Sequence, residues 1–108
     1  MLGPLANGSE ATTALVGSYV LSGAHVVTVT EALATLGATV STARGCDASG
    51  DPATACPAAD LARAKALAAD ADATVLVLGD GDGERGEWRD RDSLAMGGGQ
   101  LQLLREVA

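Results

Sequence analysis

The apolar positions of the chain follow two different periods, one typical of helices and one typical of strands. Residues 58–71 carry apolar side chains along one helical face, and Pro57 suits the first turn of a helix there. That face consists of Leu61, Ala64, Leu67, Ala68 and Ala71. Residues 73–78 are continuously apolar, the pattern of a strand that is covered on both faces. Residues 99–107 return to helical spacing, so a last helix is predicted over them.

Turn and capping residues divide the first half of the chain. Residues 2–8 look like the end of a strand that runs into a turn, because Gly, Pro and Asn-Gly favour turns. Thr28 and Glu31 have the spacing of a capping box, which predicts a helix as far as about Leu36, followed by a glycine that ends it. Residues 38–43 alternate and are rich in β-branched side chains, so they are predicted to form a second strand.

This order of elements predicts an α/β domain. The expected architecture is a partial parallel sheet with flanking helices, an α/β sandwich with Rossmann-like layering and right-handed crossovers. Ligands of such sheets bind in the loops at the carboxyl ends of the strands. The charged segment after residues 73–78 is therefore expected at the ligand-binding edge.

Composition and charge limit the classes of partner. A chain of 108 residues forms at most one domain, and no apolar run approaches the about 20 residues that a membrane helix needs. No signal peptide is visible at the N-terminus. The net charge of −7 disfavours binding to nucleic acid and to acidic membrane surfaces. Neutral or cationic partners are favoured instead.

The segment 45–57 is rich in Gly, Asp, Ser and Pro, so it is interpreted as a surface loop. It contains Cys46 and Cys56, the two cysteines of the chain. They could close a short loop in an oxidising compartment or remain free thiols, and free thiols are slightly favoured.

Several familiar site patterns fail in the charged loop. Residues 81–86 formally fit the dinucleotide pattern G-x-G-x-x-G, but they do not follow the first strand, and no helix is predicted to begin at Gly86. The acidic residues at 80, 82 and 84 resemble calcium ligands, but Arg85 stands where the calcium loop needs glycine. The lone His25 and two scattered cysteines offer no zinc spacing, and no Ser-His-Asp triad is apparent. Neither a metal nor a cofactor is expected.

Two features distinguish the loop from a simple solvated turn, which is the plain alternative. Trp88 is costly to leave in water unless it contacts something, and the loop mixes Glu with Arg instead of repeating one sign of charge. A glutamate beside an indole ring, with arginines that can hold carboxylates or hydroxyls, suits the recognition of a sugar.

The string Gly86-Glu87-Trp88-Arg89-Asp90-Arg91 resembles the G-E-x-x-D-R segment in the C-terminal α/β domain of glycoside hydrolase family 3. Further similarities are collinear with it and span nearly the whole chain: GPLA at 3–6, GSYV at 17–20, the helix at 26–37, ARGCD at 43–47, ADATVLVLG at 71–79 and QLQLL at 100–104. The family usually has L-D-L-P-G before the glutamine, whereas residues 94–98 read LAMGG and lack the proline that fixes the helix entry.

The resemblance implies that residues 1–108 are the N-terminal half of that domain, from a retaining exo-acting β-glycosidase of the β-glucosidase or β-xylosidase type. Glu87 would be the general acid/base, which protonates the leaving oxygen and then deprotonates the incoming water. In the substrate-binding part, Trp88 would form a wall for the sugar ring and Arg91 would hold the loop by pairing with a nearby carboxylate. Asp90 would be structural. Glu84 is the competing acid, and it is disfavoured because the Asp-Arg pair lies downstream of Glu87.

The family carries its nucleophile, an aspartate, on a preceding (β/α)8 barrel, and no barrel is present in this sequence. The implied partners are therefore an oligosaccharide or β-glycoside substrate and a preceding barrel domain, and the hydrolytic turnover of the chain alone should be negligible. Two alternatives stay open. One is a non-catalytic carbohydrate-binding or interaction module, and the other is an unrelated Rossmann-like ligand domain.

Overall fold

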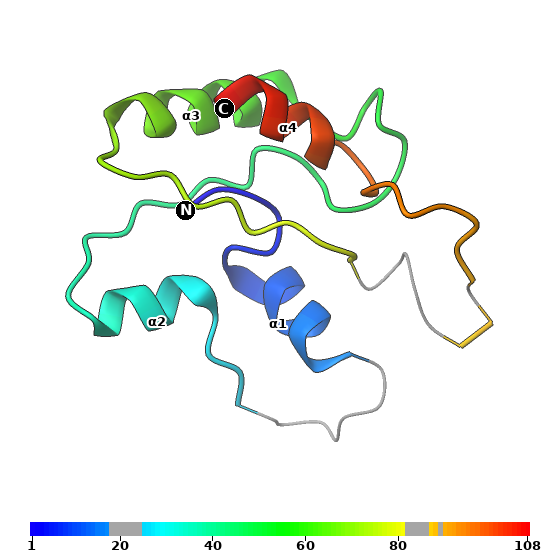
Figure 1. Ribbon diagram of the computed structural model, residues 1–108, viewed down its shortest axis with the longest axis horizontal. Coiled ribbons are helices and arrows are strands. Elements are labelled where there is room, and N and C mark those ends of the chain that lie inside the picture. Colours follow the sequence, from blue (N-terminus) through cyan, green and yellow to red (C-terminus); the bar gives the residue numbers. More distant parts are fainter. Residues whose placement is uncertain (18–24, 82–86, 89) are drawn as a thin grey trace.

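The computed structural model describes residues 1–17, 25–81, 87–88 and 90–108. The helices of this part are α1 (Gly8–Val16), α2 (Val29–Thr35), α3 (Ala58–Asp70) and α4 (Gln100–Val107). Figure 1 shows α3 and α4 on one side of three extended segments, with α1 and α2 on the other side. In the described residues, none of the helices is long and apolar enough to cross a membrane.

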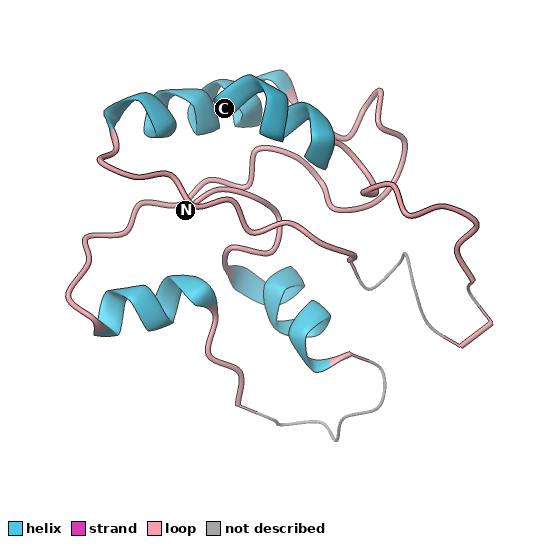
Figure 2. Cartoon of the chain, in the orientation of Figure 1, coloured by secondary structure: helices cyan, strands magenta, loops and turns pink. Residues whose placement is uncertain are grey.

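The predicted parallel sheet does not form, so the α/β sandwich expected from the sequence is wrong. Figure 2 shows the described residues as helix and loop. Within them, the segments around Leu2, Ala43 and Leu76 run parallel but meet only in isolated bridges, Leu2 with Ala43 and Leu2 with Leu76. The segments 38–43 and 73–78 are therefore extended chain and not strands.

The turn at Pro4 ends the pairing of the central segment with its two neighbours. The Leu2 amide donates to the Val75 carbonyl and the Leu2 carbonyl accepts from the Val77 amide, both at 2.8 Å. On the other side the Gly3 amide donates to the Ala43 carbonyl at 3.1 Å. Pro4 then offers no amide hydrogen, and the chain turns away, so the pairing does not continue after Gly3. The expected burial of 73–78 on both faces also fails, because Val75 is 42% exposed.

The helices agree better with the sequence, because their signals are local. The capping box of α2 is present: the Thr28 amide donates to the Glu31 carboxylate at 2.8 Å, and the Glu31 amide donates to the Thr28 hydroxyl at 3.2 Å. Gly37 follows with a φ of 85°, as expected of the glycine that ends a helix. In α3, Ala64 is fully buried and three neighbours on the predicted face pack against the core: Leu61, Leu67 and Ala68.

Helix α1 was not predicted from the sequence. Its signal is Asn7, the N-cap, whose side-chain oxygen accepts from the Gly8 amide at 2.8 Å. Ala11 of this helix is completely buried. The threonines of α1 are poor helix formers in isolation, so packing against the rest of the chain decides its conformation.

The segment 45–57 is closed by a disulfide between Cys46 and Cys56, so the preference for free thiols is wrong. Its interpretation as a surface loop is also wrong in part, since Cys46, Ala48 and Ala55 are buried. The Asp47 amide donates to the Ala55 carbonyl at 2.7 Å, which ties the two sides of the loop together. The two ends of this disulfide loop, residues 46–56, therefore belong to the core, whereas residues 50–54 are exposed.

Helix α4 packs onto the disulfide loop and α3. Leu103 is fully buried and its side chain lies against Gly45, where a Cβ would overlap the leucine. Gly45 has a φ of 74°, so a side chain is disfavoured there both by space and by backbone conformation. At the surface between the two helices, Lys65 of α3 pairs with Glu106 of α4 at 2.6 Å.

Reduction of the disulfide should destabilise the protein. The bridge closes a loop between cysteines ten residues apart, and the loss of that constraint corresponds to about 2–3 kcal/mol in the free energy of unfolding. Urea unfolding with and without dithiothreitol measures the difference. The double variant Cys46→Ser, Cys56→Ser is the control, since its stability should be low in both buffers. A wild-type curve that does not respond to the reductant would contradict the pairing.

The capping box should make stability depend on pH. Hydrogen bonds from the amide and then the hydroxyl of Thr28 hold the pKa of Glu31 below its usual range. A lowered folded-state pKa contributes stability above the unfolded pKa, and this contribution disappears as the pH falls through the folded pKa. We therefore expect the wild type to lose more stability on acidification below about pH 4.3 than Glu31→Gln does, in thermal melts at matched pH values. Parallel pH profiles for the two proteins would refute this role of Glu31.

Candidate functional site

The charged loop begins with an ion pair at its base. Asp80 follows the extended segment 73–79, and its carboxylate accepts a hydrogen bond from the Arg91 guanidinium. The second terminal nitrogen of Arg91 donates to the carbonyl of Ala95. The two paired side chains are 25% exposed for Arg91 and 34% exposed for Asp80, so water screens them only partly. The expected pairing of Arg91 with a carboxylate is thus present, and one arginine connects the start of the loop to its later part.

Glu87 and Trp88 lie together in a turn between Asp80 and Arg91, and both side chains are exposed. Trp88 is 94% exposed and has a φ of 67°, a left-handed conformation that is rare for a bulky residue. The described surroundings therefore offer the indole ring almost no apolar contact. An exposed tryptophan in an uncommon backbone conformation is a feature typical of binding loops.

Some residues of the sequence hypothesis lie outside the described part of the chain. They include the competing acid Glu84, most of the glycine string at 81–86, and Tyr19 of the GSYV segment. The structure does bring Glu87, Trp88 and Arg91 into one loop, as their closeness in sequence requires. The sequence did not identify Asp80 as the partner of Arg91.

Gln100 is the contributor to the loop that the sequence hypothesis missed. This first residue of α4 is fully buried, and its side chain bonds to the backbone at both ends of the loop. The side-chain oxygen accepts from the Gly79 amide at 2.8 Å, while the side-chain nitrogen is 2.8 Å from the Gly79 carbonyl and 3.1 Å from the Gly97 carbonyl. The sequence did contain one sign of this role, because Gln100 is a polar residue on the otherwise apolar inner face of α4.

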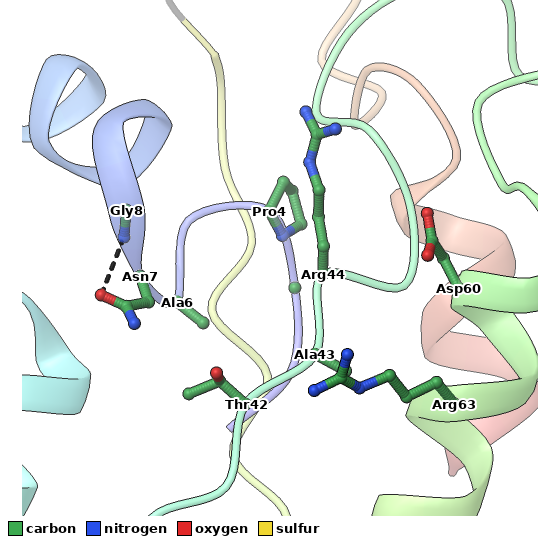
Figure 3. A pocket seen from close by; sticks show the side chains of 10 residues that line it. Pro4, Ala6, Asn7, Gly8, Thr42, Ala43, Arg44, Asp60 and Arg63 are labelled. Carbon is green, nitrogen blue, oxygen red and sulfur yellow. Dashed lines mark hydrogen bonds between the residues drawn. The ribbon is translucent and has the colours of Figure 1, made fainter.

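Two clefts on the described surface lie away from the charged loop, since neither is lined by Glu87, Trp88 or Arg91. The first has a volume of about 600 Å³ and lies between α1, α3 and residues 42–44 (Figure 3). It carries two arginines and one carboxylate, from Arg44, Arg63 and Asp60. In Figure 3 the Arg44 side chain extends away from that of Arg63, and Arg44 pairs with Asp47 at 2.6 Å. The two guanidinium groups therefore do not converge on one point.

The second cleft, about 670 Å³, is an apolar groove between α2, α3 and the extended segments. Its apolar lining includes Leu33, Leu67 and Val75. In the residues that the structure describes, no three His, Cys, Asp or Glu side chains come together as a metal site. The charged loop therefore remains the candidate site, as an exposed surface and not as an enclosed pocket.

Comparison of the chain with protein-family models, with curated proteins and with solved structures finds no match.

Loss of the ion pair should loosen the loop. Asp80→Asn removes the charge of the acceptor while keeping its size, so the two ends of the turn that carries Trp88 lose a charge-assisted hydrogen bond. Because both side chains are partly exposed, this bond contributes about 1 kcal/mol, and we expect chymotrypsin to cleave after Trp88 about fivefold faster under native conditions. Asp92→Asn, at an exposed carboxylate of the same loop, is the matched control. Equal cleavage of both variants would show that the pair does not hold the loop.

Proposed function

We propose that this chain supplies the general acid/base of a retaining β-glycosidase, and that Glu87 carries this role. Its similarity to the G-E-x-x-D-R segment of glycoside hydrolase family 3 supports the proposal. The structural observation on which it rests is that Glu87 and Trp88 share one exposed turn above the Asp80–Arg91 pair. A carboxyl group and an aromatic ring thereby share one loop whose stem is held by an ion pair, which suits recognition of a sugar and protonation of its leaving group.

The retaining mechanism needs a second carboxylate in addition to Glu87. In the retaining mechanism, one carboxyl group protonates the leaving oxygen while a carboxylate about 5–5.5 Å away attacks the anomeric carbon. The first group then removes a proton from water, which hydrolyses the glycosyl–enzyme intermediate. In the proposed assembly, a (β/α)8 barrel domain supplies the attacking aspartate and covers the loop. Glu87 performs only the proton transfers.

Exposure of Trp88 is consistent with such a partner. A tryptophan side chain has a large apolar area, and its burial stabilises a contact by about 2–3 kcal/mol. Because Trp88 is 94% exposed, its side chain is not buried by the described residues. A sugar ring placed against the indole face, with the barrel domain behind it, would bury that area.

The same observation favours a second candidate function, a non-catalytic carbohydrate-binding module. An exposed aromatic ring beside polar and charged side chains can bind a sugar by stacking and hydrogen bonding alone, without a nucleophile. In that case Trp88 would carry the function and Glu87 would only contribute a hydrogen bond. The two candidates therefore differ in whether turnover depends on Glu87.

A chimera tests the proposal. When the segment is joined to a barrel domain from glycoside hydrolase family 3, Glu87→Ala should reduce the turnover of an alkyl β-glucoside by about 10²- to 10⁴-fold, the usual contribution of general acid–base catalysis. An activated aryl β-glucoside should still form the glycosyl–enzyme intermediate rapidly, because its leaving group needs little protonation. Initial rates and burst amplitudes on the two substrates measure the difference.

Glu84→Ala in the same chimera is the matched control, and it should retain activity on both substrates. Equal losses on both substrates after Glu87→Ala would remove this residue from the acid role, and a selective loss after Glu84→Ala would transfer the role to Glu84. If turnover is insensitive to both changes while Trp88→Ala raises KM, the binding module is the better description.

A further inference from the structure

A single buried amide holds both stems of the loop that carries Glu87 and Trp88. The Gln100 side chain is fully buried and bonds to Gly79, just before Asp80, and to Gly97, where the chain approaches α4. These two glycines are 18 residues apart in sequence, and Gln100 brings their backbones to one side chain. The segment between them is therefore closed at its base independently of the Asp80–Arg91 pair.

The same amide also connects the loop to the rigid part of the core. Its nitrogen lies 3.1 Å from the carbonyl of Ala48, a fully buried residue of the disulfide loop. The Gly99 amide donates to the Asp47 carbonyl at 3.2 Å, and the Cys56 sulfur lies 3.3 Å from the Gly99 carbonyl. Gly99 has no room for a side chain, because a Cβ would overlap the Cys56 sulfur. The start of α4 is thus held against the disulfide, and Gln100 extends this anchorage to the loop.

The side chain suits this role because a primary amide both accepts and donates. One oxygen accepts from the Gly79 amide, and two N–H groups are shared among the carbonyls of Gly79, Ala48 and Gly97. An apolar side chain of the same size would leave these buried groups without partners. A charged side chain would lose either the donors or the acceptor.

We propose that Gln100 is the positioning residue of the candidate site, because it holds the two stems, at Gly79 and at Gly97, between which Glu87 and Trp88 lie in the sequence. Its significance for catalysis rests on the proposed function of Glu87, whereas its effect on the loop does not. Gln100 acts through the backbone of Gly79 and Gly97 and needs no contact with a substrate.

Native-state proteolysis of the full chain tests the proposal. Gln100→Met keeps the volume and removes the hydrogen bonds, so cleavage by chymotrypsin after Trp88 should rise at least about fivefold at low urea, the factor that corresponds to one hydrogen bond of ordinary strength. This increase should not depend on urea, because it arises from local opening and not from global unfolding. Trp88 is the only tryptophan, so its fluorescence anisotropy decay should show faster local motion in the variant.

Two controls separate positioning from general destabilisation. Leu103→Ala removes a buried side chain of the same helix, and it should raise cleavage after Trp88 only through the urea-dependent, global route. Gln102→Met, on the exposed side of α4, should behave like the wild type. If Gln100→Met does not fold, Gln100→Glu tests the same contacts, because it keeps the acceptor for Gly79 and loses the donors to three carbonyl groups.

The proposal is overturned if Gln100→Met releases the loop no more than Leu103→Ala does at equal global stability, or if the anisotropy of Trp88 is unchanged. No sugar is present in this assay, so its result is independent of the glycosidase test. If Gln100→Met releases the loop but Glu87→Ala leaves the turnover of the chimera unchanged, only the proposed function is rejected. A catalytic Glu87 with an unaffected loop would reject only the positioning role.

Discussion

The pairing of Leu2 with two distant parts of the chain organises the structure. Its amide and carbonyl bond to the segment around Leu76, and the neighbouring Gly3 amide bonds to the segment around Ala43. Because the Leu2 side chain is also buried, these backbone bonds are shielded from water and the three segments are held parallel. Their carboxyl ends then lie in the same direction, and the charged loop leaves from one of them. Helices α1 and α2 cover one side of this arrangement, and α3 and α4 cover the other (Figure 1).

A second set of contacts connects the core to the candidate site. The disulfide between Cys46 and Cys56 joins the two buried ends of a loop, α4 begins against it, and Gln100 at the start of α4 bonds to both stems of the charged loop. Each contact in this series is short and buried or half-buried, whereas the turn with Glu87 and Trp88 is exposed. The stems of the charged loop are therefore held by the core while the turn with Glu87 and Trp88 is exposed. In such an arrangement a second domain or a ligand can complete the site.

The elements that the sequence predicted correctly depend on neighbours in the chain. The capping box of α2 needs only Thr28 and Glu31, three residues apart, and α3 follows from the regular spacing of its leucines and alanines. The strands failed because a strand exists only when a partner pairs along its length. Residues 73–78 have the composition of a buried strand, yet the central segment offers them little more than Leu2, and Val75 is left exposed. Helix α1 was not predicted because its threonines have a low helix propensity, and packing against the rest of the chain stabilises the helix instead.

Local sequence was enough to predict the capped helix α2, the apolar face of α3, and one loop in which Glu87, Trp88 and Arg91 are close because the chain is continuous. The packing of remote segments brings Cys46 to Cys56, Arg91 to Asp80, and the amide of Gln100 between Gly79 and Gly97. The difference arises from distance along the chain. Helix caps and turns are selected by energies within a few residues, whereas a disulfide, an ion pair or a buried amide forms only after packing has brought remote groups together and excluded water from them.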